Sequence, residues 1–195
     1  MPAVIGLTGS VSAGKSAALE ALARLGAATI SSDAVVHDLL ATDEMRDVLA
    51  ERWGAEVAPE GRLDRSRVAE IVFRDSDELS WLESQLHPRV GQAIAEWREG
   101  LDHDAELAVV EVPLLFESGM EEGFDAVLAV TAPLEVRAER AAGKGLGELE
   151  GRESRLMPEA EKAARSDFVV ANDGTVADLE AKLEALLPEL KSARR

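Results

Sequence analysis

Eight residues near the N-terminus, Gly9 to Ser16, have the types and the spacing of a phosphate-binding loop. They read Gly-Ser-Val-Ser-Ala-Gly-Lys-Ser and match the pattern G-x-x-x-x-G-K-[ST] at every fixed position. In such a loop, glycines let successive backbone N–H groups point at phosphate oxygens. Lys15 can bridge the β- and γ-phosphates, and the hydroxyl of Ser16 can ligate Mg²⁺. The motif therefore predicts binding of a nucleoside triphosphate together with Mg²⁺.

A strand and a helix flank this loop, which is the context that the motif requires. Residues 3–8 form an apolar run typical of a buried strand, and residues 15–25 carry Ala and Leu at helical spacing before Gly26. The alternative is a chance Gly-Lys-Ser at the start of a helix. Ser10 and Ser12 stand where many such loops have glycine. A serine that needs a positive φ would cost about 1 kcal/mol.

Four further short apolar runs predict strands, and they alternate with helical patterns in the rhythm of a parallel sheet. The predicted strands are residues 28–31, 107–112, 126–131 and 168–171. The last helix opens with Thr175 and Asp178 at capping-box spacing and runs to Leu187. We expect an α/β chain with the three-layer P-loop NTPase fold and a parallel five-stranded sheet.

About 75 residues separate the second and third predicted strands, far more than an ordinary crossover needs. The interval is helical in pattern throughout, and Pro88 is expected at the first position of the last helix. The expected helices are residues 33–40, 43–53, 66–73, 77–86 and 89–101. We predict one P-loop domain, 1–195, whose core (1–32, 104–142 and 158–195) carries a helical insertion at 33–103. Because ligands bind at the carboxyl ends of such strands, an insertion that leaves after the second strand is expected to hang over the ligand crevice.

Composition excludes several classes of protein. The chain has 21 Lys+Arg and 38 Asp+Glu, so 21 − 38 gives −17, which argues against a nucleic-acid binder or a polybasic membrane anchor. The absence of cysteine excludes disulfides and thiolate sites. An Asn-Lys-x-Asp motif typical of GTPases is missing, and His37 and His103 join no metal-like cluster. With no signal-peptide pattern and no apolar run of membrane-spanning length, we expect a cytoplasmic protein.

Further sequence blocks join the phosphate loop, and together they resemble the dephospho-CoA kinase family from Ile5 to about Leu187. The most specific block is Pro-Leu-Leu-Phe-Glu at residues 113–117. The others are Ile5-Gly6-Leu7-Thr8-Gly9, Ile30-Ser31-Ser32-Asp33 with His37, Gly61-Arg62-Leu63-Asp64-Arg65 with Val72-Phe73, Leu86-His87-Pro88, Arg137 with Arg140, and Ala171-Asn172-Asp173-Gly174. The resemblance implies transfer of the γ-phosphoryl group of ATP, with Mg²⁺, to the ribose 3′-hydroxyl of dephospho-CoA, the last step of coenzyme A biosynthesis.

Asp33 is the candidate base, because it aligns with the second Asp of the family's Asp-x-Asp pattern at the end of the second strand. The first Asp of that pattern is Ser31 here. The alternative for Asp33 is a helix N-cap, and the two roles can coexist. The resemblance also implies Lys15 and Arg140 as catalytic residues beside Asp33.

The implied ATP site comprises the loop and Asn172, whose alternative is a simple turn residue. Its residues are Ser12, Ala13, Gly14, Lys15, Ser16, Ala17 and Asn172. Residues 143–157 are expected to form a lid in which Lys144 and Arg152 reach transferring charge. The alternative for Arg140, Lys144 and Arg152 is a solvated basic face paired with nearby glutamates. The lid is about two residues short, and Leu156 replaces a usual Gln.

The implied acceptor site includes residues whose alternatives are structural. Its candidates are Thr8, Asp33, His87, Leu114 and Phe116. Leu114 and Phe116 follow the third strand, where apolar residues usually belong to the core. His87 is expected to position the acceptor rather than to move protons. Glu111 and Glu117 are candidates for indirect contact with the metal ion.

Two other readings stay open. One is a different small-metabolite or nucleotide kinase on the same core, and the other is a nucleotide-binding regulator that has lost catalysis. The departures at Ser10, Ser12, Ala17, Ser31 and Leu156 support the regulator. The expected partners are the small molecules ATP and dephospho-CoA, with no nucleic acid and no membrane, and the expected state is a monomer or a weak homo-oligomer.

Overall fold

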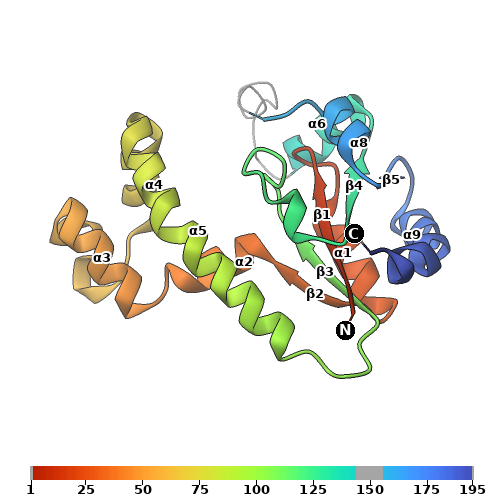
Figure 1. Cartoon of the computed structure of the whole chain (residues 1–195). Helices are drawn as coiled ribbons and strands as arrows, with labels where there is room; N and C mark the ends of the chain where they lie inside the picture. The colour runs from red at the N-terminus through yellow and green to blue at the C-terminus, as the bar shows by residue number, and fades with distance from the viewer. Residues whose placement is uncertain (1, 144–155, 195) are drawn as a thin grey trace. The chain divides into compact units, whose positions relative to one another are not determined.

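The computed structural model describes residues 2–143 and 156–194, and the chain divides into two compact units. The first unit comprises Met1–Ser31 and Leu101–Arg195, and the second comprises Ser32–Gly100. Figure 1 follows both along the chain, with the helices of the second unit coloured orange to yellow-green.

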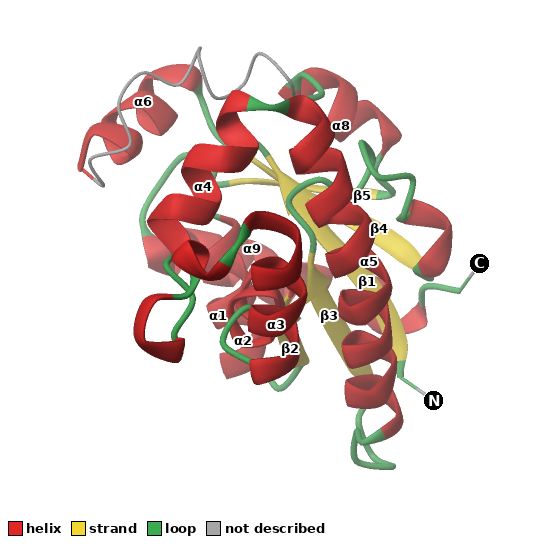
Figure 2. Ribbon diagram, turned by 90° about the vertical axis from the view of Figure 1, so that its left-hand side faces the viewer, coloured by secondary structure: helices red, strands yellow, loops and turns green. Residues whose placement is uncertain are grey.

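The first unit contains a parallel sheet of five strands in the order β2-β3-β1-β4-β5. The strands run side by side, yellow in Figure 2. Their bounds are β1 Ala3–Gly9, β2 Ala28–Ser31, β3 Leu107–Glu111, β4 Ala126–Thr131 and β5 Phe168–Ala171. The predicted parallel five-stranded sheet is confirmed, and β1 lies at its centre, with β3 on one side and β4 on the other.

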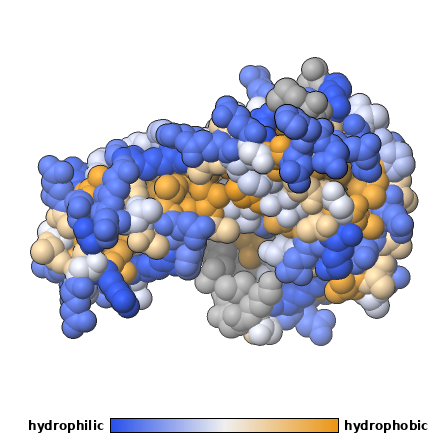
Figure 3. Space-filling view, turned by 90° about the horizontal axis from the view of Figure 1, so that it is seen from below, coloured by the Kyte–Doolittle hydropathy of each residue, from blue (hydrophilic) through white to orange (hydrophobic). Residues whose placement is uncertain are grey.

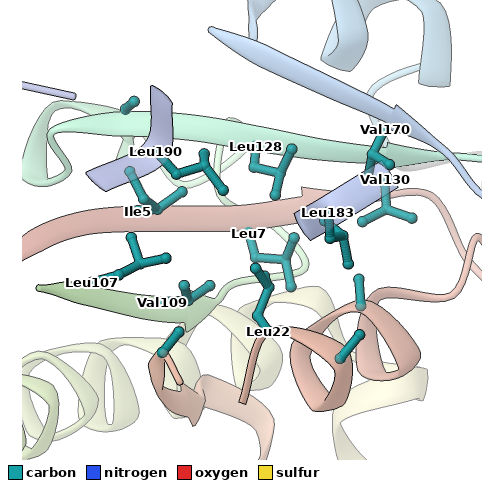
Figure 4. Close-up of a cluster of buried hydrophobic side chains, with 14 of the residues drawn as sticks. Ile5, Leu7, Leu22, Leu107, Val109, Leu128, Val130, Val170, Leu183 and Leu190 are labelled. Atoms are coloured by element: carbon teal, nitrogen blue, oxygen red, sulfur yellow. The ribbon is translucent and has the colours of Figure 1, made fainter. Parts of the chain in front are cut away.

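Helices α1 (Lys15–Arg24) and α9 (Val176–Ser192) pack against each other and against the sheet. Their apolar side chains and alternate residues of the strands form one buried cluster, in which Ile5 and Leu7 of β1 meet Leu22, Leu183 and Leu190 (Figure 4). The predicted capping box is present, because Thr175 and Asp178 exchange side chain to backbone hydrogen bonds. The remaining described helices of this unit are α6 (Leu134–Gly143), α8 (Glu159–Arg165) and the short η3 (Glu121–Gly123).

The second unit lies between β2 and β3 in the sequence and is helical, as predicted. Its elements are α2 (Ser32–Leu39), α3 (Asp43–Trp53), η1 (Ala55–Val57), η2 (Pro59–Gly61), α4 (Arg65–Arg74) and α5 (Ser76–Glu99). It has a core of its own, built around the buried side chains of Met45, Leu49, Val68 and Val72. Trp53 and Trp81 close one side of this core with their ring centroids 5.3 Å apart.

The prediction of two helices separated at His87 and Pro88 is wrong, because α5 runs through both residues without a break. Leu82, Leu86, Val90 and Ile94 form one buried row at a spacing of four residues, which continues past the proline. Proline inside a helix costs about 3 kcal/mol, and burial of four large side chains outweighs that cost. The guanidinium of Arg89 also donates to the carbonyl oxygen of Gln85 (2.9 Å) in the same turn.

Candidate active site

The phosphate loop joins the end of β1 to the start of α1, and its two glycines are required by what lies against them. A Cβ atom on Gly9 would come within 2.3 Å of the carbonyl oxygen of Val130 in β4. A Cβ atom on Gly14 would come within 2.0 Å of the side-chain nitrogen of Asn172, and its φ of 103° lies in the region that favours glycine. A side chain at Gly9 would therefore require the backbone to move, and one at Gly14 would displace the side chain of Asn172 and strain the backbone.

Asn172 holds the loop from the far end of the chain. It follows β5 directly, is buried, and donates its side-chain amide to the carbonyl oxygen of Ala13 (2.8 Å). Its backbone N–H donates to the carbonyl of Thr131 at the end of β4 (2.7 Å). The side-chain amide of Asn172 is thus committed to the loop backbone. A simple turn role, the alternative from sequence, does not account for this contact.

Lys182 of α9 secures the two neighbours of Asn172. Its ammonium donates to the carbonyl oxygen of Ala171 (2.8 Å) and pairs with the carboxylate of Asp173 (2.6 Å). The hydrogen bond from Lys182 is the largest cause that holds the pKa of Asp173 below its ordinary value. Sequence analysis missed this lysine, because a lysine on a helix that carries many charges gives no signal of its own.

Arg140, in the last turn of α6, reaches the same point of the loop. One of its guanidinium nitrogens donates to the carbonyl oxygen of Ala13, and the other donates to the side-chain oxygen of Asn172, both at 3.3 Å. The structure therefore brings together three residues that the sequence predicted separately. These contacts hold Arg140 against the loop, and its catalytic role stays a prediction.

Two side chains of the loop itself have the properties of an anion site. The ammonium of Lys15 lies across the loop and donates to the carbonyl oxygens of Gly9 (3.1 Å) and Ser10 (3.2 Å). The hydroxyl of Ser12 is buried and has no hydrogen-bond partner among residues 2–143 and 156–194. Buried hydroxyls are normally paired, so this one fits a partner that a bound ligand supplies. Of the two serines that stand where glycine is usual, Ser12 has a positive φ, at 58°, and Ser10 does not.

Lys162 of α8 is a buried cation that sequence analysis missed. Its side chain is 1% exposed, and the ammonium lies 2.9 Å from the carboxylate of Glu117 and 2.9 Å from the carbonyl oxygen of Pro113. Glu117 also accepts a hydrogen bond from the backbone of Met157 (2.9 Å). Glu117 is thereby occupied by a structural pair, so its suggested contact with a metal ion has no support in the structure.

Comparison with known proteins decides the family. A family model described as dephospho-CoA kinase matches residues 3–178. The chain is 34% identical over 197 residues to a dephospho-CoA kinase of Thermobifida fusca, with 96% of each chain covered. It is 38% identical over 192 residues to that of Thermus thermophilus, with 97% of this chain and 92% of the relative covered. This chain belongs to the dephospho-CoA kinase family.

Solved structures agree. The protein TT1252 from Thermus thermophilus superposes with a TM-score of 0.83 at 37% identity, covering 97% of this chain and 98% of that one. The dephospho-CoA kinase from Campylobacter jejuni gives 0.72 at 28% identity, with 98% of each chain covered. Shikimate kinase from Aquifex aeolicus, with a TM-score of 0.54 at 16% identity, shares only the fold with this chain. The predicted P-loop kinase fold is therefore confirmed.

Asp33, which matches the family's second Asp, is the second residue of α2, and its side chain is exposed. The helix begins at Ser32, so the alternative role of Asp33 as an N-cap residue does not hold. A carboxylate in the first turn is still favoured by the helix dipole. A single residue, Ser32, lies between it and Ser31, the last residue of β2. His87, also in the helical unit, is exposed on α5.

Three residues expected in the family's acceptor site belong to the first unit. Thr8 is buried, and its hydroxyl donates to the carbonyl oxygen of Pro113 (3.3 Å), which also accepts from Lys162. Phe116 is buried beneath the guanidinium of Arg165, 4.6 Å from the ring centroid. Leu114 is exposed. Phe116 thus has the burial of a core residue and Leu114 is exposed, and a contact of either with the acceptor stays a prediction.

The remaining predicted residues are placed as follows. Ser16 is exposed at the second position of α1, and Ala17 follows it. Glu111 is buried at the end of β3, beside Leu7 of β1 and Ser31 of β2. Lys144 and Arg152 lie outside the described residues. Residues 2–143 and 156–194 hold no group of three His, Cys, Asp or Glu side chains that could bind a metal, and none of their helices could cross a membrane.

Proposed function

We propose that this chain transfers the γ-phosphoryl group of ATP to the 3′-hydroxyl of the ribose of dephospho-CoA, giving CoA and ADP. The observation that carries the proposal is the match to the dephospho-CoA kinase family over residues 3–178, joined to a complete phosphate loop held by Asn172 and Arg140. The reaction is the last step of coenzyme A biosynthesis.

The loop binds the triphosphate of ATP. The backbone of residues 12–17 surrounds the phosphates, and the unpartnered hydroxyl of Ser12 gains an acceptor when a phosphate oxygen arrives. Lys15 exchanges its two loop carbonyls for phosphate oxygens, which are stronger acceptors for an ammonium group. In this way a chain with a net charge of −17 builds a local site for an anion.

The donors at the start of α1 fit Mg²⁺, because the exposed hydroxyl of Ser16 is a hard oxygen ligand. Mg²⁺ usually binds through few protein ligands together with phosphates and water, so a dedicated carboxylate cage is not required. When bound, the ion neutralises charge on the β- and γ-phosphates. We therefore propose Ser16 as its protein ligand.

Asp33 is the proposed base. Its exposed carboxylate can accept a hydrogen bond from the acceptor hydroxyl, orient it and take its proton as the O–P bond forms. The departing group is ADP. Phosphoryl transfer asks the protein chiefly for alignment and charge stabilisation, so Lys15 and Arg140 supply positive charge to the transferring group.

The other assignments stay predictions. Thr8, His87, Leu114 and Phe116 are proposed acceptor contacts, and Lys144 and Arg152 are proposed to act from a lid at residues 143–157. The helical insertion is proposed to bind the acceptor. A location in the cytoplasm also stays a prediction, as does a monomeric or weakly oligomeric state, which light scattering after gel filtration would measure.

Coupled ADP release with a panel of acceptors tests the proposal. We expect turnover with dephospho-CoA and little with nucleosides or shikimate, and mass spectrometry should find one added phosphate on dephospho-CoA. Turnover of a nucleoside without turnover of dephospho-CoA would assign the chain a different acceptor. ATP binding without any phosphorylated product would identify a regulator.

A further inference from the structure

Two adjoining cavities lie within the helical unit, and their linings differ in chemistry. The larger, about 600 Å³, lies between the 37–46 segment and the turn at residues 61–65. The smaller, about 320 Å³, lies between α2 and α4. They share four lining residues, and these are His37, Leu40, Leu63 and Arg65. A single elongated ligand could therefore occupy both.

The larger cavity is basic. Its lining includes Arg46, Arg62 and Arg65 and a single carboxylate, that of Asp43. Arg46 pairs with both Asp43 (2.5 Å) and Asp47 (2.7 Å), so the positive charge of Arg46 is more than compensated. Within the described part of the chain, Arg62 and Arg65 have no carboxylate at ion-pair distance. The cavity therefore keeps an uncompensated positive charge in a strongly acidic chain.

Arg65 is held in place without being neutralised. One guanidinium nitrogen contacts Nδ1 of His37 (2.5 Å), and the other donates to the carbonyl oxygen of His37 (2.8 Å). Because a guanidinium has no acceptor, Nδ1 of His37 must accept, and the ring proton lies on Nε2. A guanidinium has five N–H donors, and these two contacts use only two of them. An arginine that is oriented but uncompensated is preorganised for a phosphate group.

The smaller cavity is largely apolar and has Asp33 in its wall. Val36, Val68 and Val72 contribute to its lining, and Phe73 forms part of it although 79% of its surface is exposed. Figure 3 shows hydrophobic residues reaching the surface of the helical unit among hydrophilic ones, at the left of the view. An open aromatic ring on an apolar wall is suited to stacking against a purine base.

Asp33 and His37 lie one helical turn apart on α2, a rise of about 6 Å. That separation is comparable with the span of a ribose between its 3′-hydroxyl and its 5′-phosphate. We propose that the basic cavity binds the diphosphate of the acceptor nucleotide through Arg62 and Arg65, and that the apolar cavity receives its adenine on Phe73. The ribose then lies along α2 with its 3′-hydroxyl at Asp33. This inference rests on the proposed function and assigns residues to its acceptor.

Steady-state kinetics of Arg62→Gln and Arg65→Gln test the assignment. Each variant should raise the KM for dephospho-CoA about tenfold or more, because a charge-assisted contact to phosphate is lost, and should leave the KM for ATP unchanged. Arg62→Gln removes a side chain that pairs with no carboxylate among residues 2–143 and 156–194, so it changes the charge without breaking an ion pair of the described fold. Arg98→Gln is the matched control, since it removes the same charge from α5 outside both cavities.

Adenosine, an acceptor without phosphates, distinguishes the contribution of the basic cavity to binding from that of the apolar cavity. The wild type should have a far lower kcat/KM for adenosine than for dephospho-CoA. The arginine variants should lose kcat/KM for dephospho-CoA but not for adenosine, so the ratio of the two values should fall. Phe73→Ala should raise the KM for both acceptors, and Phe73→Trp should bring both KM values back toward those of the wild type. An unchanged KM for dephospho-CoA in active, folded arginine variants would overturn this inference and leave the proposed function standing. No turnover of dephospho-CoA by the wild type would overturn the proposed function itself.

Discussion

The side-chain amide of Asn172 donates to the carbonyl oxygen of Ala13, across 159 residues of sequence. The contact is possible because Gly14 has no Cβ atom, which would lie 2.0 Å from the amide nitrogen. A glycine of the phosphate loop and an asparagine after the last strand are therefore one structural unit. Arg140 completes it by donating to the carbonyl oxygen of Ala13 and to the side-chain oxygen of Asn172.

Replacing Asn172 by Asp should damage this unit more than replacing it by Ala. The aspartate keeps an acceptor for Arg140 but has no hydrogen to donate, and it places a carboxylate against the carbonyl of Ala13. Loss of a buried hydrogen bond that leaves its partner unpaired costs about 1–3 kcal/mol. We expect the KM for ATP to rise about tenfold in Asn172→Ala and further in Asn172→Asp, measured by coupled ADP release. Equal, wild-type KM values in both variants would mean that the contact has no role in nucleotide binding.

Ser12→Ala should have opposite effects on stability and on binding. Removing a buried hydroxyl without a partner should raise the free energy of unfolding of the nucleotide-free protein by about 1 kcal/mol. The positive φ stays equally strained in alanine. Affinity for ATP should fall several-fold, because the phosphate loses a donor. Urea denaturation and titration calorimetry measure the two effects. A less stable variant with unchanged ATP affinity would contradict the assigned role of the hydroxyl.

Lys162→Met should destabilise the chain by about 3–5 kcal/mol, because it leaves the carboxylate of Glu117 without its cation. The double variant Lys162→Met with Glu117→Leu should recover much of the loss, since neither charge then remains. Denaturant unfolding of the two single variants and the double variant gives the coupling energy. Additive effects would show that the two residues do not act as a pair.

Acid should weaken the same pair. Burial raises the pKa of the Glu117 carboxyl, but the hydrogen bonds from Lys162 and from the backbone of Met157 outweigh burial and bring the pKa below its ordinary value. A depressed pKa in the folded state adds stability that is fully present above the unfolded value, about 4.3, and is lost as the pH falls through the folded value. The free energy of unfolding should therefore fall more steeply below about pH 4.3 in the wild type than in Glu117→Gln. If the free energy of unfolding had the same slope against pH in both proteins, Glu117 would have no part in acid unfolding.

The sequence predicted the sheet well, because buried parallel strands are continuous apolar runs between turn signals. Residues 28–31, 126–131 and 168–171 were predicted with the bounds that the structure has. The prediction from sequence was wrong at Pro88, because the local preference of proline indicated the start of a new helix there. In the structure one helix continues through Pro88, since the buried row from Leu82 to Ile94 stabilises it. Tertiary packing of this kind leaves no mark at the proline itself.

In the candidate site, motifs identified the phosphate loop, Arg140 and Asn172, but could not show how these contact one another. The Lys162–Glu117 pair, the anchor at Lys182 and the contact between Arg65 and His37 were missed. Each of these interactions is made by a lysine or an arginine, and 30% of the residues in this chain are charged. Only burial and geometry distinguish such residues from ordinary surface charges.

The most direct test of the account compares Asp33→Asn with the wild type in two measurements made on the same protein. Titration calorimetry should give an unchanged Kd for ATP, because the phosphate loop is intact. Turnover of dephospho-CoA should fall by about 10²–10⁴-fold, the contribution of a positioned base, and the residual product should carry its phosphate on the 3′-oxygen. A fully active Asp33→Asn variant would contradict the claim that this carboxylate directs the acceptor hydroxyl.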